Sequence, residues 1–367
     1  MPDESKKALI AMSGGVDSSI AAALTIEAGF DCVGVTMKLY GGADEAPAGE
    51  GTCCSLSDVE DARSVAYRLG MKYYVFNFTE GFDECVIRRF IDAYERGVTP
   101  NPCIDCNRYM KFAQLYRRAR ELGRGVIVTG HYARTEYDSA SGRWLLKKAK
   151  NLEKDQSYVL YFLSQDQLAH TRFPLGSFTS KEEVRALAAR YGFVNAAKRD
   201  SQDICFVPDR DYAGFIERRT GRVYPHGDFV DTEGRVLGEH KGMIRYTVGQ
   251  RKGLGLALPA PMYVCRKDME NNRVVLCGGE GLFTRELIAS DFNWIAFETP
   301  PSELRACAKA RYSAKEAPAL VRPLEDGRVS VVFDQPQRAL TEGQAVVLYD
   351  GDVVIGGGTI TEVRRSV

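Results

Sequence analysis

Residues 11–19 read AMSGGVDSS and follow directly on a short apolar run, KALIAM, at residues 7–12. The apolar run predicts a buried strand, and residues 17–28 have helical spacing. The paired glycines let the backbone turn tightly, while the next amides and the helix N-terminus direct positive dipoles at an anion. An ordinary capped turn is the alternative, because Gly, Asp and Ser are common turn formers. Five specified residues directly after a strand favour an anion-binding loop.

The loop is not of the Walker type, because no Gly-Lys-Ser/Thr follows the glycines. Ser13 and Ser18 can donate hydroxyl hydrogen bonds to an anion. Asp17 suits a phosphate site only if Mg²⁺ bridges the carboxylate and the phosphate. The loop therefore predicts a site for a polyphosphate with its metal ion.

Strands and helices alternate after the loop, as in βαβ units with a parallel sheet. Further strands are expected at 32–40, 73–78 and 125–132, and helices at 57–69, 83–96, 107–122 and 181–191. A capping box is predicted at Ser57 and Glu60. Residues 41–52 predict a mobile loop, and residues 135–146 predict a hairpin.

From about residue 212 onward, short β-like runs are separated by Gly, Pro and Asp, which is typical of small β domains or barrels. We expect an α/β parallel-sheet nucleotide-binding and catalytic domain at 1–208. A small, mostly β central domain follows at 209–284, and a C-terminal β-barrel at 285–367.

Composition indicates a protein of the reducing cytoplasm. The 367 residues include 49 Lys and Arg against 49 Asp and Glu, so nucleic acid would have to bind to local basic patches. No apolar run has the length of a membrane span, and the first residues do not resemble a secretory signal. The ten cysteines are scattered, and an unusual pair among them would be catalytic or metal-binding.

Two segments carry candidate thiols. NPCIDCN, residues 101–107, opens a helix rich in basic residues, and thiols at such helix starts are more often thiolates. The basic face could receive a phosphate backbone, although for its outer arginines a solvated surface is the better interpretation. Cys205, in the segment RDSQDICFV, would alone be interpreted as a small core residue. The helix bears these cations: Arg108, Lys111, Arg117, Arg118, Arg120 and Arg124.

Several segments resemble those of one enzyme family. The loop SGGVDS resembles that of the ATP pyrophosphatase, or PP-loop, superfamily, which grips the pyrophosphate of ATP. NPCIDCNRYMKF, KDQSYVLYFL, DSQDICFV and TVGQRKGLGL resemble, in this order, segments of the bacterial tRNA-specific 2-thiouridylase family. GHYAR (130–134) and ARYS (310–313) do so as well. The resemblance covers nearly the whole chain.

The resemblance implies an ATP-dependent sulfur transferase. ATP would adenylate the C2 oxygen of the wobble uridine in tRNAs for Lys, Glu and Gln, a cysteine persulfide would deliver sulfur, and AMP would leave. The implied partners are the tRNA anticodon stem-loop and a persulfide donor such as a cysteine desulfurase or a sulfur-relay protein. The implied cofactors are ATP and Mg²⁺.

The resemblance also assigns roles to residues of this chain. Cys205 would hold the persulfide, and Cys106 would attack or resolve it, through a transient disulfide. The residues expected to face the target base are Asn101, Pro102 and Cys103. Those expected to bind ATP are Ala11, Met12, Ser13, Gly14, Gly15, Val16, Asp17, Ser18, Met37 and Gly130. Those expected to touch tRNA are His131, Lys154, Asp155, Gln156, Arg311, Tyr312 and Gln344.

Some alternatives stay open at this point. Cys103, Cys106 and Cys205 could hold a [4Fe–4S] cluster, whereas zinc would need a fourth ligand that the sequence does not offer. Other functions are an amidating or ligating PP-loop enzyme, which would give Cys106 and Cys205 no use, and a non-catalytic tRNA-binding protein that senses nucleotide. The following cysteines are expected to have no chemistry: Cys32, Cys53, Cys54, Cys85, Cys265, Cys277 and Cys307.

Overall fold

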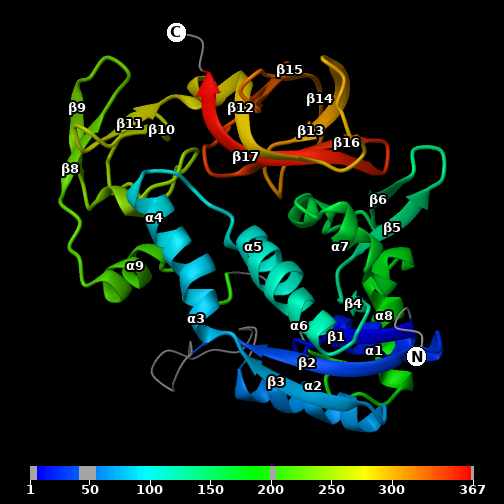
Figure 1. The fold of residues 1–367 in the computed structure, drawn as a ribbon. Helices are drawn as coiled ribbons and strands as arrows, with labels where there is room; N and C mark the ends of the chain where they lie inside the picture. The colour runs from blue at the N-terminus through cyan, green and yellow to red at the C-terminus, as the bar shows by residue number, and fades with distance from the viewer. Residues whose placement is uncertain (1–5, 41–54, 199–203, 365–367) are drawn as a thin grey trace.

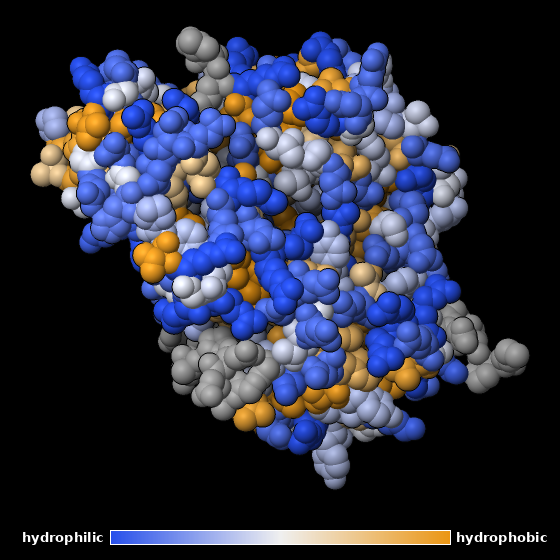
Figure 2. Space-filling model, turned by 60° about the vertical axis from the view of Figure 1, so that its left-hand side comes forward, coloured by the Kyte–Doolittle hydropathy of each residue, from blue (hydrophilic) through white to orange (hydrophobic). Residues whose placement is uncertain are grey.

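The structure, a computed structural model, describes residues 6–40, 55–198 and 204–364. The expected mobile loop at 41–52, the pair Cys53-Cys54 and Arg199 lie outside these residues. In the described part no helix is long and apolar enough to cross a membrane. The face in Figure 2 is largely hydrophilic, and its apolar residues are scattered in small groups.

A five-stranded parallel sheet forms the N-terminal layer, in the order β3-β2-β1-β4-β7. Its strands are β1 Lys7–Ala11, β2 Asp31–Lys38, β3 Lys72–Asn77, β4 Val126–Val128 and β7 Thr171–Arg172. Alternate residues of β1 enter different cores: Ala8 and Ile10 pack on one side, and Leu9 on the other. Both faces are therefore covered, as a parallel sheet requires.

Helices cover the two faces of this sheet (Figure 1). Those of one face are α1 Val16–Glu27, α2 Leu56–Arg68 and α8 Lys181–Arg190. On the other face, one helix consists of α3 Thr79–Phe82, the π-helical η2 Asp83–Arg88 and α4 Arg89–Glu95. Beside it, a second consists of α5 Pro102–Asp105, the π-helical η3 Cys106–Leu115 and α6 Tyr116–Glu121.

Three predicted helix starts differ from those in the structure. The capping box of α2 is made by Ser55 and Asp58, not by Ser57 and Glu60, because Ser55 and Asp58 bond each other's backbone N–H groups. The helix expected from Asp83 begins at Thr79. The helix expected from 107 begins at Pro102, a favoured first residue of a helix.

The predicted hairpin is present as β5 Ala133–Asp138 and β6 Arg143–Lys148, but it extends the C-terminal sheet. Its strand β6 pairs with β17, Val353–Arg364, where Leu146 lies opposite Val354. The first domain is thus tied to the last by backbone hydrogen bonds. Short elements between this hairpin and α8 are η4 Ser157–Leu160, α7 Gln165–Ala169 and η5 Pro174–Ser177.

The rest of the chain is mainly β. A helix, α9 Tyr212–Thr220, comes first, although β structure was expected from residue 212. A four-stranded sheet follows, made of β8 Gly227–Val230, β9 Val236–His240, β10 Tyr263–Asp268 and β11 Arg273–Cys277, with the short η6 Met243–Arg245 and η7 Gly279–Leu282.

The last sheet closes into a barrel. Its strands are β12 Phe283–Trp294, β13 Leu304–Lys309, β14 Ala317–Pro323, β15 Val329–Arg338, β16 Ala345–Asp350 and β17. They run in the order β12-β15-β14-β13-β16-β17, and pairing of β12 with β17 completes the circle. The predicted fold class is confirmed: an α/β parallel-sheet domain, a small β domain and a C-terminal β-barrel.

Candidate active site

The glycine loop between β1 and α1 is held against the start of α2. Gly14 has φ +77°, and a Cβ there would lie 2.3 Å from the carbonyl oxygen of Asp58, so only glycine fits. The Asn195 amide donates to the Gly14 carbonyl (2.8 Å) and to the Ser19 hydroxyl (2.9 Å). The turn is therefore fixed from two sides.

The serine hydroxyls of the loop bond within the loop. The Ser18 hydroxyl donates to the Gly15 carbonyl at 3.0 Å and lies 3.2 Å from the backbone nitrogen of Ser13. Gly130, just after β4, packs directly on the start of α1: a Cβ there would lie 2.7 Å from the Ser18 nitrogen. These contacts hold the loop's backbone amides at the N-terminus of α1. Amide groups gathered at a helix N-terminus can bind an anion.

Asp17 lies in a charged cluster. Both of its carboxylate oxygens accept from the Lys181 ammonium at 2.7 Å, and one accepts from the Tyr132 hydroxyl at 2.8 Å. Lys181 is buried, with a side chain only 8% exposed. Since Lys181 begins α8, where a helix dipole disfavours a cation, the carboxylate of Asp17 supplies the compensating charge.

A second lysine fixes α2 near the loop. Lys198 donates to Asp58 at 2.7 Å and to Asp61 at 2.6 Å. Partial burial opposes the charge of this lysine, but the two carboxylates outweigh burial and raise the pKa of Lys198. This ion pair stabilises the backbone of Asp58, against which Gly14 packs.

The first turn of the cysteine helix carries two thiols with different surroundings. The Asn101 side chain accepts from the Cys103 backbone N–H at 3.2 Å and caps the helix. Cys103 is exposed, whereas Cys106 is half-buried and packs against the apolar core above the sheet. The Cys106 thiol is therefore partly shielded from solvent by the apolar core, whereas the Cys103 thiol is not.

Cys205 packs against the same apolar core as Cys106. Its sulfur accepts a hydrogen bond from the Tyr40 hydroxyl at 2.9 Å. Tyr40 comes two positions after β2, the strand beside β1, at the edge of the sheet where the glycine loop begins. The glycine loop and Cys205 thus lie at the same edge of the sheet.

Asp105 adjoins Cys106 and is poorly solvated. Burial raises the pKa of Asp105 to about 6, and the cation of Arg89, 3.6 Å away, offsets part of that rise. Cys85 is close to the same pair, and burial raises the pKa of its thiol. A carboxyl with such a pKa changes its charge near neutral pH.

Several residues expected to touch tRNA surround the start of the cysteine helix. Gln344 of the barrel donates to the Thr99 carbonyl at 2.7 Å, just before Asn101. The Tyr312 hydroxyl lies 3.3 Å from the Asp155 carbonyl. Burial raises the pKa of Tyr312, and the nearby Asp155 and Cys103 raise it further. Residues far apart in sequence therefore meet at Asn101–Cys103.

The other expected contacts have structural partners. Arg311 donates to the Thr341 hydroxyl at 2.8 Å, and Gln156 accepts from the Tyr132 backbone N–H at 3.0 Å. Lys154, two positions before Gln156 in the chain, is partly exposed. His131 is buried, hydrogen-bonded to the Thr129 hydroxyl at 2.7 Å, and burial holds its pKa well below the usual range. A contact of His131 with tRNA would require neighbouring side chains to move.

Comparison with known proteins places these features in a family. The family described as tRNA methyl transferase HUP domain matches residues 6–209. The PRC-barrel domain of that family matches 213–278, and the aminomethyltransferase beta-barrel domain matches 284–360. The tRNA-specific 2-thiouridylase MnmA of Acetivibrio thermocellus is 54% identical over 97% of this chain and 99% of its own length.

The chain belongs to the tRNA-specific 2-thiouridylase family. Its relatives include the 2-thiouridylase MnmA of Clostridioides difficile, 50% identical over 97% of this chain and 98% of that protein. Among solved structures, a 4-thiouridine synthetase in complex with RNA and ATP aligns with 59% of this chain and 50% of its own, at 20% identity and a TM-score of 0.37. That structural similarity is too distant to inform function.

The alternative that Cys103, Cys106 and Cys205 hold an iron–sulfur cluster is judged by how the structure places these residues. In the described ranges, which include Cys103, Cys106 and Cys205, no group of three or more His, Cys, Asp or Glu side chains is arranged to hold a metal ion. The placement of the three thiols therefore gives no support to the iron–sulfur alternative.

Sequence patterns missed four residues of this 2-thiouridylase-family site: Tyr40, Lys181, Asn195 and Lys198. The sequence held a signal for one of them, Lys181. A lysine in the first turn of a predicted helix is disfavoured by the helix dipole, so an acidic partner is expected for it. The other three side chains come from loops or a strand end, and only the fold shows which residues they contact.

Proposed function

We propose that this protein is an ATP-dependent tRNA-uridine 2-sulfurtransferase. The observation that carries the proposal is full-length similarity to relatives named tRNA-specific 2-thiouridylase, for example at 54% identity over 97% of the chain. The site supports it, since a rigid anion-binding loop and Cys205 occur at the same edge of one sheet.

The first step is adenylation of the substrate. Ala11–Ser18 would bind the pyrophosphate of ATP through backbone amides, with Met37 and Gly130 beside the adenosine. Asp17 would hold Mg²⁺ in exchange for its contacts with Lys181 and Tyr132, and the ion would neutralise charge on the phosphates. The uridine C2 oxygen attacks the α-phosphorus, pyrophosphate leaves, and the poor leaving group becomes AMP.

The second step is sulfur transfer. The terminal sulfur of a Cys205 persulfide attacks C2, and AMP leaves with the former C2 oxygen. Cys106 thiolate then attacks the Cys205 sulfur and breaks the S–S bond, which leaves the C2 thiocarbonyl on the base. The products are 2-thiouridine and a Cys106–Cys205 disulfide, which an external dithiol reductant resets to two thiols.

The target uridine must leave the anticodon stack, at a cost of a few kcal/mol that is least for loop nucleotides. Asn101, Pro102 and Cys103 would face the flipped base. Lys154, Asp155, Gln156, Arg311, Tyr312 and Gln344 would contact the tRNA around it, together with His131. The contacts of Gln344 and Tyr312 near Asn101–Cys103 support this placement.

The substrates would be tRNAs for Lys, Glu and Gln, in the cytoplasm. Sulfur would come from a cysteine desulfurase or a sulfur-relay protein. Mass spectrometry of anticodon nucleosides tests the proposal, after incubation with ATP, Mg²⁺, a persulfide donor and unmodified tRNA. ATP-dependent 2-thiouridine supports it. Unchanged uridine with all reactants present would contradict it.

A further inference from the structure

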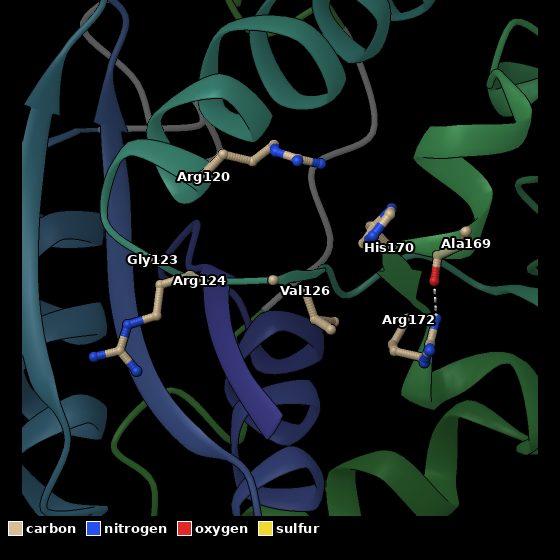
Figure 3. Close-up of a pocket in the computed structure, with 8 residues that line it drawn as sticks. Arg120, Gly123, Arg124, Val126, Ala169, His170 and Arg172 are labelled. Atoms are coloured by element: carbon tan, nitrogen blue, oxygen red, sulfur yellow. Dashed lines mark hydrogen bonds between the residues drawn. The ribbon is translucent and has the colours of Figure 1, made fainter. Parts of the chain in front are cut away.

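A second candidate binding site lies at the opposite edge of the parallel sheet. Its pocket, with a volume of about 380 Å³, opens where α6 ends and β4 begins, beside the end of α7 and β7 (Figure 3). The glycine loop follows the C-terminal end of β1, which is parallel to β4, so the pocket and the loop lie at different ends of the strands. The lining residues have no part in the ATP, target-base or tRNA roles assigned above; Arg120 and Arg124 belong to the basic helix face that the sequence offered as a possible surface for a phosphate backbone. The lining residues are Arg120, Gly123, Arg124, Gly125, Val126, Ala169, His170 and Arg172.

The pocket is strongly basic. Three arginines and a histidine line it, and among the described residues no Asp or Glu does. Figure 3 shows Arg120 extending across the opening towards His170, with Arg172 below that ring. Asp31 lies 2.8 Å from Arg124, and Asp166 lies 4.0 Å from Arg120 and 3.3 Å from His170, so one arginine of the lining, Arg172, is left without a carboxylate partner among the described residues. The lining thus offers positive charge to an anion.

Arg172 gives the strongest indication that the pocket binds an anion. Its guanidinium donates to the backbone carbonyls of Ala169 and Thr171, at 2.8 and 2.9 Å, and lies 5.4 Å from the ring centre of Trp144. In the described part of the chain it has no carboxylate partner, and burial lowers its pKa without a compensating anion. Such a half-buried arginine is held rigidly and retains donors for a ligand.

The lining favours a phosphate over a nucleotide base. Arginine forms bidentate hydrogen bonds with phosphate oxygens, and the lining includes the guanidinium groups of Arg120 and Arg172. No Phe, Tyr or Trp is among the described residues that line the pocket, so a base would find the ring of His170 as its one aromatic surface there. Phosphate contacts of this kind position a nucleic acid without reading its sequence.

We propose that this pocket binds a backbone phosphate of the tRNA, away from the anticodon loop; this inference rests on the proposed function. The helix that begins at Pro102 carries Cys106 near its start and Arg120 near its end. At the rise of a helix these residues are about 20 Å apart. One tRNA can therefore reach both, and the pocket would fix the orientation of the molecule while its anticodon enters the active site.

The test compares tRNA binding by the wild type, Arg120→Gln and Arg172→Gln at a series of salt concentrations. Arg63→Gln is the matched control, because Arg63 is another exposed helical arginine with a carboxylate three residues away. Each phosphate contact contributes a slope of roughly 0.7–0.9 in log K against log salt. Each pocket variant should thus lower the slope by roughly 0.7–0.9. The loss of affinity relative to the wild type should therefore be about threefold smaller at 200 mM salt than at 50 mM salt.

Steady-state thiolation gives a second readout. The pocket variants should raise KM for tRNA and leave kcat near that of the wild type. Melting temperatures show whether Arg172→Gln folds; Arg120→Gln removes an exposed side chain and keeps the test decisive in either case. If Arg120→Gln binds tRNA with the affinity and salt slope of Arg63→Gln, the proposal is wrong.

Titration with inorganic phosphate distinguishes the two possible ligands of the pocket, a phosphate of the tRNA backbone and a free phosphate ion. Two results together would overturn the RNA assignment: wild type binds inorganic phosphate with a Kd below about 1 mM, and both pocket variants bind tRNA as the wild type does. The pocket would then be a site for free phosphate. Failure of the proposed function is distinguishable, because wild type would then bind tRNA through the pocket without forming 2-thiouridine.

Discussion

Replacing Gly130 by alanine should impair the nucleotide step without disturbing the thiols. The added Cβ would lie 2.7 Å from the Ser18 nitrogen and 2.8 Å from the Asp17 carbonyl carbon, both backbone atoms. Ordinary contact begins near 3.4 Å, so the start of α1 would have to move by about 0.7 Å. Misplacement by 1 Å can cost about 100-fold in rate. We therefore expect kcat/KM to fall roughly 10- to 100-fold, equivalent to about 1.4–2.7 kcal/mol.

The assay is tRNA-dependent release of pyrophosphate from ATP, with the melting temperature as a measure of folding. Gly278→Ala is the control, since a Cβ at Gly278 meets nothing within 4 Å. Its kcat/KM should equal that of the wild type. Gly130→Ala that melts like the wild type and retains kcat/KM within twofold would refute the inference that Gly130 positions the loop.

Three further predictions follow from single contacts. Tyr40→Phe removes the hydrogen bond to Cys205 and should slow single-turnover thiolation up to about tenfold, while pyrophosphate release stays unchanged. Gln344→Ala removes the bond to the Thr99 carbonyl and should raise KM for tRNA about fivefold, measured by steady-state thiolation; an unchanged KM would contradict it. Asp105 has a folded pKa of about 6 against 3.8 unfolded, so the folded state binds the extra proton and stability falls as pH rises from 4 to 6. Asp105→Asn should remove this fall of about 2–3 kcal/mol in urea unfolding; equal pH profiles for both proteins would contradict it.

Local pattern predicted most of the first domain. KALIAM, the glycine loop and the helix after it are contiguous, so their periodicity and turn chemistry are visible in one window. Helix starts were less visible, because several adjacent residues can cap. Ser55 and Ser57 are both competent N-caps, and tertiary packing around Asp58 and Lys198 decided between them.

Long-range pairing explains what sequence patterns could not supply. The hairpin at 133–148 was predicted as a hairpin, yet its partner β17 lies about 200 residues later, and no local signal encodes that pairing. The contact of Lys181 with Asp17 and that of Tyr40 with Cys205 likewise join segments more than 160 residues apart. Such contacts depend on the arrangement of whole layers around the sheet.

In the proposed mechanism, a Cys205 persulfide delivers sulfur to the uridine and Cys106 then breaks the S–S bond, which we call the two-thiol relay. Single-turnover sulfur transfer measures this relay most directly. Enzyme loaded with persulfide is mixed with ATP, Mg²⁺ and unmodified tRNA, and the anticodon nucleosides are analysed by mass spectrometry. Wild type should form 2-thiouridine, whereas Cys205→Ser and Cys106→Ser should form none and still release pyrophosphate. Formation of 2-thiouridine by Cys205→Ser at the wild-type rate would contradict the relay.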